Sequence, residues 1–357
     1  MRCPKCRTEY FCALSCQTRF FCSSCQQKRA LLFAEKLREE ILAPVHHRHW
    51  IFTIPVSLRQ LFLRERRLLG ILPRCAFLAI RRTFAAVLGQ EDARPGMVVA
   101  LQTFGSQLQF NPHLHCLVSD GVFRKGGEFV PFPVFDEDFE QLLTETFRRL
   151  VLDALVTAHR LSEDFRDRLL SFRHGGGFSV YGRHLILNEE PARLAHMARY
   201  ALRPPVAMER VHQGDDGQVL LDIPPDHRTG ATVLSLDPLE WLRRVTNQIP
   251  EKGTHLVRYF GAYANRVRQL YRDTEGEVTE DRAEKEPLLP NSRASWARLM
   301  RKVFEVDPLT CRRCGAEMKV ISVITAGPLI DQLLRHVRRK AAEEGGDPFD
   351  ARAPPAG

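Results

Sequence analysis

The sequence predicts an α+β protein with a small cysteine-rich module at its N-terminus. Two strand-like runs, residues 97–104 and 108–118, are separated by a Gly-Ser pair, a pattern typical of a β-hairpin. Apolar residues recur at helical spacing in residues 28–42 and 138–158, with charged residues between them. Six of the ten cysteines lie within the first 25 residues, which sets this segment apart from the rest of the chain.

The other expected elements follow from local signals. The helix of residues 190–202 has to end before Pro204 and Pro205, because a residue that precedes proline disfavours helical geometry. Asp237 is expected to cap the helix that follows it. Further elements are a strand at 49–54, helices within 58–89, a strand at 178–187, short strands within 206–236, a helix near 296–304, and a closing strand and helix.

These elements are expected to form five segments. The segments are a zinc-binding module with its helix at 1–43, a core at 44–212, an accessory α/β segment at 213–310, a cysteine knuckle with strand and helix at 311–342, and a disordered tail at 343–357. A polar stretch at 273–293 is expected to be flexible.

The N-terminal module contains two C-x-x-C turns, Cys3-Pro-Lys-Cys6 and Cys22-Ser-Ser-Cys25. Fifteen residues separate the turns, within the spacing typical of a structural zinc site. Each turn places two thiolates on one side of a metal, and two turns complete a tetrahedral site. We therefore expect Cys3, Cys6, Cys22 and Cys25 to bind zinc.

Other cysteines leave the ligand set open. Either Cys12 or Cys16 could replace one of these ligands, or the pair could support a second, incomplete site. Free buried or redox-active thiols are the alternative to zinc ligation. Cys311 and Cys314 form another C-x-x-C turn without a partner pair in the nearby sequence. His336 is a speculative third ligand for that turn, and a tight turn with two thiols is the simpler interpretation.

Basic side chains are concentrated near the N-terminus. The chain has 52 Lys and Arg against 43 Asp and Glu, a net charge of +9. Residues 1–90 hold 16 Lys and Arg but only five Glu and no Asp, so the remainder is nearly neutral. This asymmetry indicates a nucleic-acid partner, with Arg19, Lys28 and Arg29 as candidate phosphate contacts.

No membrane partner is expected. No stretch approaches the roughly 18 apolar residues of a membrane span. Met1 is followed by cysteines rather than by the apolar segment of a signal peptide. We therefore expect a cytoplasmic protein, and a homo-oligomer is compatible with the sequence.

A His-x-His pair lies in the second run of the hairpin. Since side chains alternate along a strand, His113 and His115 should share one face while Leu114 points into the opposite core. Two imidazoles at this spacing can converge on a divalent cation. Two hydrogen-bonded histidines without a metal are the plainer alternative.

Tyr200 lies in the last turn of the helix at 190–202, near Arg199 and Arg203. A tyrosine can attack a phosphodiester when cations stabilise its phenolate and the charge of the transition state. His196 lies one helical turn earlier on the same face. The alternative is an ordinary helix tyrosine that packs on the core.

Two other groups are weaker candidates. Tyr259 and Tyr263 also lie four residues apart, but we expect them to be structural. His46, His47 and His49 stand at the start of an apolar strand without an acidic neighbour, so packing or solvated roles are expected for them.

The order of these motifs resembles a known family. The cysteine module is followed by QTFGSQLQFNPHLHCLVSDGVF, ARYALRPPVAMERV, LVRYFGAYANRVR and CRRCG. In this combination the sequence resembles the rolling-circle transposases of bacterial insertion sequences. These proteins belong to the His-hydrophobe-His (HUH) single-strand nuclease superfamily and carry an N-terminal zinc-binding domain. The resemblance extends from Cys3 to about His336.

The resemblance implies a fold and a mechanism. It implies a nuclease core with an antiparallel sheet, with His113 and His115 on a central strand where they hold Mg or Mn. Tyr200 would be the nucleophile that cuts single-stranded DNA through a 5′-phosphotyrosine. A plasmid replication or mobilisation nuclease of the relaxase type, or a non-catalytic zinc-ribbon DNA-binding protein, are the alternative functions.

The sequence departs from the paired-tyrosine members of the family at one position. Those members have two tyrosines four residues apart, and here the earlier position is His196. That departure argues against a mechanism that alternates two tyrosines and makes His196 a candidate third metal ligand. Gln102 and Gln109 are competing candidates for that ligand.

Overall fold

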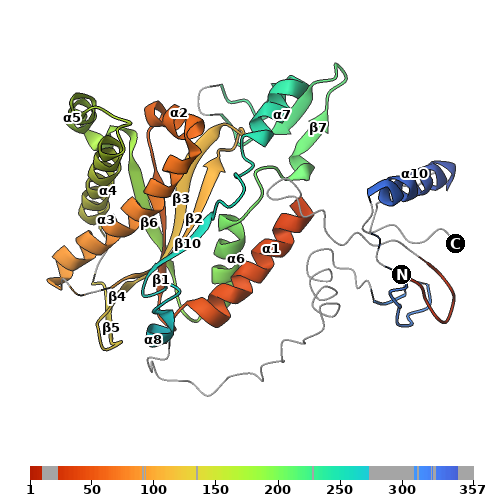
Figure 1. Ribbon diagram of the computed structural model, residues 1–357, viewed down its shortest axis with the longest axis horizontal. Helices are drawn as coiled ribbons and strands as arrows, with labels where there is room; N and C mark the ends of the chain where they lie inside the picture. Colours follow the sequence, from red (N-terminus) through yellow and green to blue (C-terminus); the bar gives the residue numbers. More distant parts are fainter. Residues whose placement is uncertain are drawn as a thin grey trace. The chain divides into compact units, whose positions relative to one another are not determined.

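The contacts of the computed structural model divide the chain into two units (Figure 1). One unit is Thr18–Glu280, and the other combines Met1–Gln17 with Asp281–Gly357. The structure describes residues 1–9, 23–90, 92, 94–133, 136–226, 229–272, 309–311, 313–322, 324 and 327–344. The expected helix at 296–304, the stretch at 273–293 and most of the tail lie outside these residues.

A five-stranded sheet forms the centre of the Thr18–Glu280 unit, in the order β10-β2-β3-β1-β6. Every neighbouring pair is antiparallel. The strands are β1 His47–Thr53, β2 Gly96–Phe104, β3 Phe110–Ser119, β6 Ser179–Ile186 and β10 Val257–Gly261. The expected hairpin is confirmed as β2 and β3, which places the His-x-His strand in the middle of the sheet.

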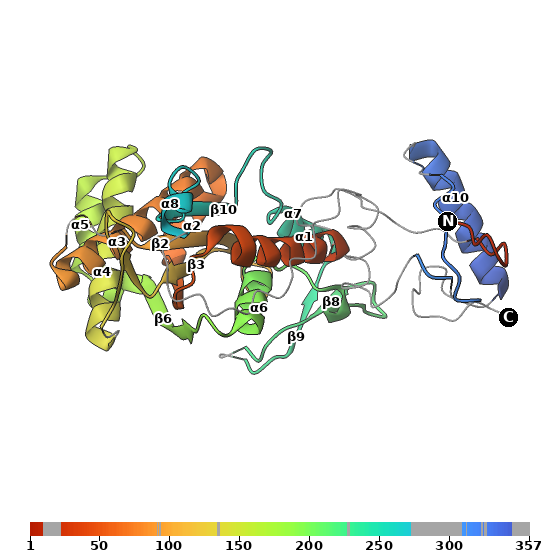
Figure 2. The same cartoon turned by 90° about the horizontal axis from the view of Figure 1, so that it is seen from below.

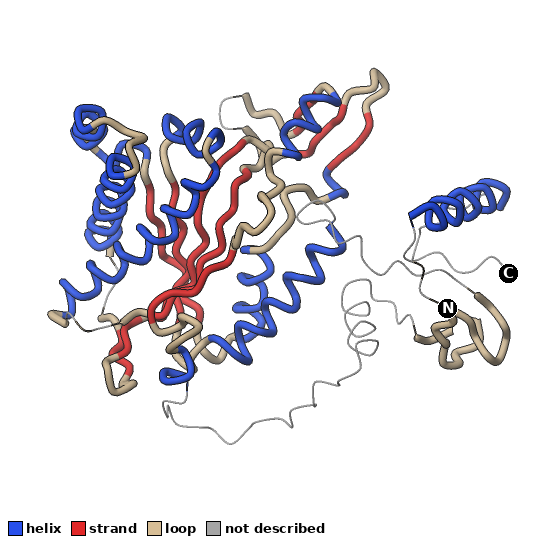
Figure 3. Tube along the Cα trace, in the orientation of Figure 1, coloured by secondary structure: helices blue, strands red, loops and turns tan. Residues whose placement is uncertain are grey.

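Helices cover both faces of this sheet (Figure 3). On one face, residues of β1, β2 and β3 pack with helices into the largest apolar core, which includes Trp50, Phe52 and Leu114. The helices of this face are α2 Val56–Arg64, α3 Ile71–Leu88, α4 Glu137–Thr157 and α5 Glu163–Ser171. Gly89 ends α3 in the left-handed conformation, as a helix-stop glycine is expected to do.

Two helices cover the opposite face. They are α1 Ser23–Lys36, continued by a π-helical turn at Leu37–Ile41, and α6 Pro191–Ala201. The two helices lie side by side (Figures 1 and 2). Their apolar side chains pack with those of β2 and β3 into a second core.

This packing divides the chain differently from the expected segments. The helix assigned to the zinc module at 1–43 belongs mostly to the Thr18–Glu280 unit, because its apolar side chains pack against the sheet. The accessory segment at 213–310 is also divided, since it contributes β10 to the central sheet. The C-terminal knuckle joins the N-terminal residues in the other unit.

The remaining elements are short, except for the 18-residue helix α10. They are β4 Gly121–Phe123, β5 Phe129–Pro131, β7 Val211–Gln213, β8 Val219–Asp222, β9 Val233–Leu236, α7 Pro238–Thr246, α8 Arg268–Arg272 and α10 Gly327–Glu344, with 3-10 turns at Arg66–Gly70, His174–Gly177 and Met208–Arg210. The expected cap of α7 is confirmed, because the Asp237 side chain accepts hydrogen bonds from the backbone N–H groups of Leu239 and Glu240. Among the described residues, no helix combines the length and apolarity that crossing a bilayer requires.

Candidate metal and tyrosine site

His113 and His115 lie on the sheet face that α1 and α6 cover. Leu114, between them, points into the opposite core and is fully buried, as the strand period predicts. The two imidazole centroids are 5.0 Å apart. The spacing therefore suits two ligands of one cation.

A backbone contact orients the ring of His113. Its Nδ1 lies 2.8 Å from the carbonyl oxygen of Asn111. Because a carbonyl can only accept, Nδ1 carries the proton and donates it. The lone pair of the imidazole is therefore on Nε2, the arrangement typical of a metal-binding histidine.

A third histidine, His49, orients His115. A hydrogen bond of 3.0 Å joins His49 Nε2 to His115 Nδ1, and the two rings are stacked with centroids 5.2 Å apart. Burial lowers the pKa of His115 to about 2 and that of His49 to about 4, so both rings are neutral near pH 7. The Nε2 atom of His115 is buried without a hydrogen-bond partner. His49, for which a packing or solvated role is expected, therefore also contacts the candidate metal ligand His115.

Gln102 stands opposite His113 on the neighbouring strand β2. Its amide nitrogen donates hydrogen bonds of 2.9 Å to the carbonyl oxygens of Tyr200 and Ala201. Its Oε1 atom is buried without a hydrogen-bond partner. An amide oxygen is a good ligand for Mg or Mn, so Gln102 fits the donor set.

The two competing third ligands are placed differently. Gln109 is exposed, and its Oε1 accepts a hydrogen bond from the backbone N–H of Gln107. His196 is exposed on α6 and is absent from the described ring contacts of His115. Burial and hydrogen bonding therefore favour Gln102 over both.

Tyr200 meets the histidines from the last turn of α6. Its ring is nearly perpendicular to that of His115, with centroids 5.2 Å apart, and 40% of the residue is exposed. The guanidinium carbon of Arg203 lies 4.5 Å from the centroid of the Tyr200 ring. A helix end thus presents an accessible phenol beside two imidazoles and a cation.

A second arginine, Arg59 on α2, contributes positive charge near His113. The pKa of His113 is lowered mainly by burial, and the positive charges of Arg203 and Arg59 lower it further. The Nε atoms of both arginines are buried without a hydrogen-bond partner. Arg59 is not among the predicted site residues, because nothing near it in the sequence marks it as a neighbour of a strand more than fifty residues later.

Three other predicted DNA contacts lie on helices. Arg29 on α1 and Arg199 on α6 are exposed, and Lys28 is half-buried. Arg19 lies outside the described residues.

The lower-ranked tyrosine pair is structural in its surroundings. Tyr263 is buried, and a hydrogen bond of 2.7 Å joins its hydroxyl to Nε2 of His47. Tyr259 lies on β10, where it is half-buried. Burial raises the pKa of both phenols, which opposes a role as nucleophile.

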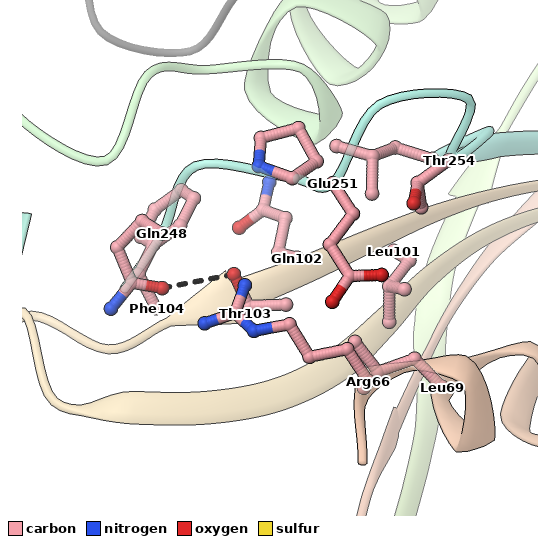
Figure 4. Close-up of a pocket in the computed structure, with 11 residues that line it drawn as sticks. Arg66, Leu69, Leu101, Gln102, Thr103, Phe104, Gln248, Glu251 and Thr254 are labelled. Atoms are coloured by element: carbon pink, nitrogen blue, oxygen red, sulfur yellow. Dashed lines mark hydrogen bonds between the residues drawn. The ribbon is translucent and has the colours of Figure 1, made fainter. Parts of the chain in front are cut away.

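A pocket borders this site at the end of β2 (Figure 4). Gln102 and Thr103 line it together with Gln248, and Arg66 and Glu251 bring opposite charges to its wall. Thr103 Oγ1 donates a hydrogen bond of 2.9 Å to Gln248 Oε1. The contact attaches the residues that follow α7 to the strand that carries Gln102.

A separate cluster of four cysteines lies in the unit that joins the two ends of the chain. The sulfur atoms of Cys3, Cys6, Cys311 and Cys314 all lie within 4.8 Å of one another. The thiols of the first C-x-x-C turn thus lie beside those of the C-terminal turn, whereas the sequence predicts the pair at residues 22 and 25 as their partners.

Of the remaining expected ligands, the two that the structure describes, Cys25 and His336, are not part of this cluster. Cys12, Cys16 and Cys22 lie outside the described residues. Cys25 stands near the start of α1, in the Thr18–Glu280 unit, and His336 is exposed on α10. Two similar C-x-x-C turns at opposite ends of the chain were the available signal, but spacing rules consider only neighbouring pairs.

An antiparallel sheet with a His-x-His strand, an exposed helix tyrosine and a four-cysteine cluster together point to a DNA-processing protein with a zinc-binding domain. Residues 96–270 match a family described as "Putative transposase", and residues 1–54 match the "Transposase zinc-binding domain". The chain belongs to the family of IS91- and IS801-type insertion-sequence transposases.

Two relatives support this assignment. The transposase for insertion sequence element IS801 of Pseudomonas savastanoi pv. phaseolicola is 30% identical over 289 residues, which cover 78% of this chain and 68% of the relative. "Putative transposase y4qJ" of Sinorhizobium fredii is 27% identical over 263 residues, which cover 69% of this chain and 65% of the relative. The chain thus spans about two thirds of each relative. No solved structure matches it.

Proposed function

We propose that this transposase cuts and rejoins single strands of DNA at the ends of an insertion sequence, with Tyr200 as nucleophile and a divalent cation as cofactor. One observation carries the proposal: two buried polar atoms, His115 Nε2 and Gln102 Oε1, lack hydrogen-bond partners next to an exposed tyrosine. Buried polar atoms are rarely left without partners in folded proteins, and a bound cation would supply the partner if His115 Nδ1–H donates to His49.

The residues present fit Mg or Mn. His113 Nε2, His115 Nε2 and Gln102 Oε1 would hold the cation; the amide oxygen suits Mg or Mn, and the two imidazole nitrogens favour Mn over the harder Mg. A bound cation supplies Lewis-acid polarisation of the scissile phosphate. His49 keeps the ring of His115 in place through their hydrogen bond.

The covalent step is a transesterification. The phenol oxygen of Tyr200 attacks phosphorus, the P–O bond to the 3′ oxygen breaks, and that oxygen leaves as a 3′-hydroxyl. The phenol proton passes to solvent or to the leaving oxygen. A strand 3′-hydroxyl then attacks the 5′-phosphotyrosine and releases Tyr200, so no nucleotide energy source is required.

Two arginines would stabilise the charge of this step. The guanidinium of Arg203 lies over the Tyr200 ring, where its positive charge would stabilise the negative charge that develops in the transition state. Arg59 and Arg203 both have buried Nε atoms without partners, and a phosphate oxygen would satisfy them. Neither arginine needs to read a base, so their contribution is independent of DNA sequence.

Contacts to the rest of the DNA would come from exposed cations. Arg29 and Lys28 on α1 and Arg199 on α6 lie on the two helices that cover the site face. Phosphate contacts of this kind supply affinity that decreases with salt concentration. Arg19 and the zinc-binding domain are further candidates for DNA contacts.

The proposal is tested by trapping the covalent intermediate. The protein is incubated with labelled single-stranded DNA of the element's ends and Mn, and adducts are separated by denaturing electrophoresis. Tyr200→Phe should abolish the adduct. Tyr181→Phe is a matched control, because Tyr181 is equally exposed at 39%, and it should leave the adduct unchanged.

Two outcomes decide the assignment. Adduct formation in Tyr200→Phe would exclude this tyrosine as the nucleophile. Adduct formation that survives His113→Ala and His115→Ala together would exclude the metal site. Loss of the adduct in Tyr200→Phe and in the double histidine variant, with an unchanged adduct in Tyr181→Phe, supports both the nucleophile and the metal site.

A further inference from the structure

The first C-x-x-C turn has a defined backbone geometry. The N–H of Cys3 donates to the carbonyl of Thr8 at 2.9 Å, and the N–H of Arg7 donates to the carbonyl of Cys3 at 3.0 Å. Arg7, directly after Cys6, adopts a φ of 60°, which is uncommon for a residue with a side chain. A non-glycine residue keeps this conformation only where its surroundings require it.

The C-terminal turn repeats this geometry position by position. The N–H of Cys311 donates to the carbonyl of Ala316 at 2.8 Å, and the N–H of Gly315 donates to the carbonyl of Cys311 at 2.8 Å. Gly315, directly after Cys314, has a φ of 69°. Two segments about 300 residues apart thus form the same turn, each with two thiols on its inner side.

Backbone pairing joins the two turns. Each turn is flanked by an antiparallel bridge, Arg2↔Glu9 in the first and Thr310↔Glu317 in the second. A third bridge links Arg2 to Lys319 through two hydrogen bonds of 2.8 and 2.9 Å. Main-chain hydrogen bonds therefore hold the two turns against each other, in addition to the contacts between their sulfur atoms.

The sulfur positions match a tetrahedral site. Cys3 Sγ lies 3.5 Å from Cys314 Sγ, and Cys6 Sγ lies 3.5 Å from Cys311 Sγ. Zinc–sulfur bonds of about 2.3 Å place the sulfurs of a tetrahedral site roughly 3.8 Å apart. Cys3 and Cys311 are almost fully buried, so the thiolates would be shielded from solvent.

We propose that Cys3, Cys6, Cys311 and Cys314 bind one structural zinc ion, so that the zinc-binding domain is built from both ends of the chain. The matched zinc-binding region, residues 1–54, contains only the first two of these ligands. The ion would close a loop that contains the whole Thr18–Glu280 unit. This inference does not depend on the nuclease chemistry proposed above.

Zinc stoichiometry tests whether the two turns share one ion. Zinc per chain is measured in the full-length protein, in Cys3→Ser/Cys6→Ser, in Cys311→Ser/Cys314→Ser and in the quadruple variant. Shared ligation predicts that each double variant loses one equivalent and that the quadruple variant loses no more than one. A quadruple variant that loses two equivalents, or a C-terminal variant that loses none, overturns the proposal.

Alkylation with N-ethylmaleimide, read out on peptides by mass spectrometry, identifies the ligands directly. In the zinc-loaded protein, Cys3 and Cys6 should be protected, and Cys311→Ser/Cys314→Ser should raise their labelling rates by about tenfold or more. Cys25→Ser is the control and should leave them protected. If Cys25→Ser raises the labelling rates of Cys3 and Cys6 and Cys311→Ser/Cys314→Ser leaves them protected, the second pair of ligands lies in the N-terminal segment. That result would overturn the proposal.

Two cysteines report on folding in the same experiment. Cys75 and Cys116 are buried in the core of the Thr18–Glu280 unit, so they stay unlabelled while that unit is folded. Labelling of Cys3 and Cys6 without labelling of Cys75 and Cys116 shows loss of the metal site rather than global unfolding.

Discussion

The imidazoles of His49 and His115 stack and share a hydrogen bond of 3.0 Å, and Nε2 of His115 is the ring nitrogen left without a hydrogen-bond partner. His49 is on β1 and His115 on β3, two strands that pair directly in the sheet. Burial holds both rings neutral near pH 7, the state that a metal ligand and its hydrogen-bond partner require. His49 is therefore a positioning residue for the proposed site.

His49→Ala is expected to weaken Mn binding by about 10- to 100-fold, because partners of ligating histidines have effects of this size. Adduct formation measured against Mn concentration should show a higher Mn requirement and a nearly normal rate at saturation. His184→Ala, at an exposed histidine on β6, is the control. An equal loss of rate at every Mn concentration would contradict a role through the metal.

Arg203→Ala is expected to lower the single-turnover cleavage rate by about 10²- to 10³-fold, because it removes a cation from the Tyr200 ring. Arg59→Ala should have an effect in the same direction. Arg199→Ala should instead weaken DNA binding and reduce its salt dependence, since Arg199 is exposed. Equal rates for Arg203→Ala and wild type at saturating DNA would refute the assignment.

Gly182→Ala is expected to lower the free energy of unfolding by about 1–3 kcal/mol or more, because the strand packs closely there. A Cβ atom at Gly182 would lie 2.1 Å from the Trp50 ring, and Trp50 is fully buried. Gly126→Ala, where a Cβ meets nothing within 4 Å, should be nearly neutral. Denaturant titration of both variants measures the difference, and equal midpoints would argue against the close packing.

His47 is expected to make the protein acid-sensitive. Burial lowers its pKa to about 3, whereas an unfolded histidine has a pKa of about 6.5. Between these pH values only the unfolded state binds the proton, so His47 contributes stability above pH 6.5 that is lost as the pH falls. The expected loss is about 1.4 kcal/mol per pH unit.

The variant His47→Gln isolates this contribution. Its free energy of unfolding should depend less steeply on pH between about 6 and 3 than that of wild type. The difference in slope should correspond to about one proton fewer taken up on unfolding. His255→Gln, at an exposed position, is the control. Parallel curves for wild type and His47→Gln would contradict the proposed burial effect.

Much of the fold could be predicted from local patterns. The hairpin that carries His113 and His115, the helix that ends with Tyr200 and the cap at Asp237 all depend on residues close in sequence. The strand β10 at Val257–Gly261 was missed, because its short run has no clear period and its place is decided by pairing with β2.

For the site, the sequence by itself determined the chemical groups: two imidazoles on one strand face, a phenol at a helix end and turns with paired thiols. Only the tertiary structure decided which groups meet. Strand register brings His49 to His115 and Gln102 to the strand of His113, and facing turns bring Cys3 to Cys314. Side-chain periods are local properties of the chain, whereas register and packing depend on contacts between residues far apart, which no local pattern encodes.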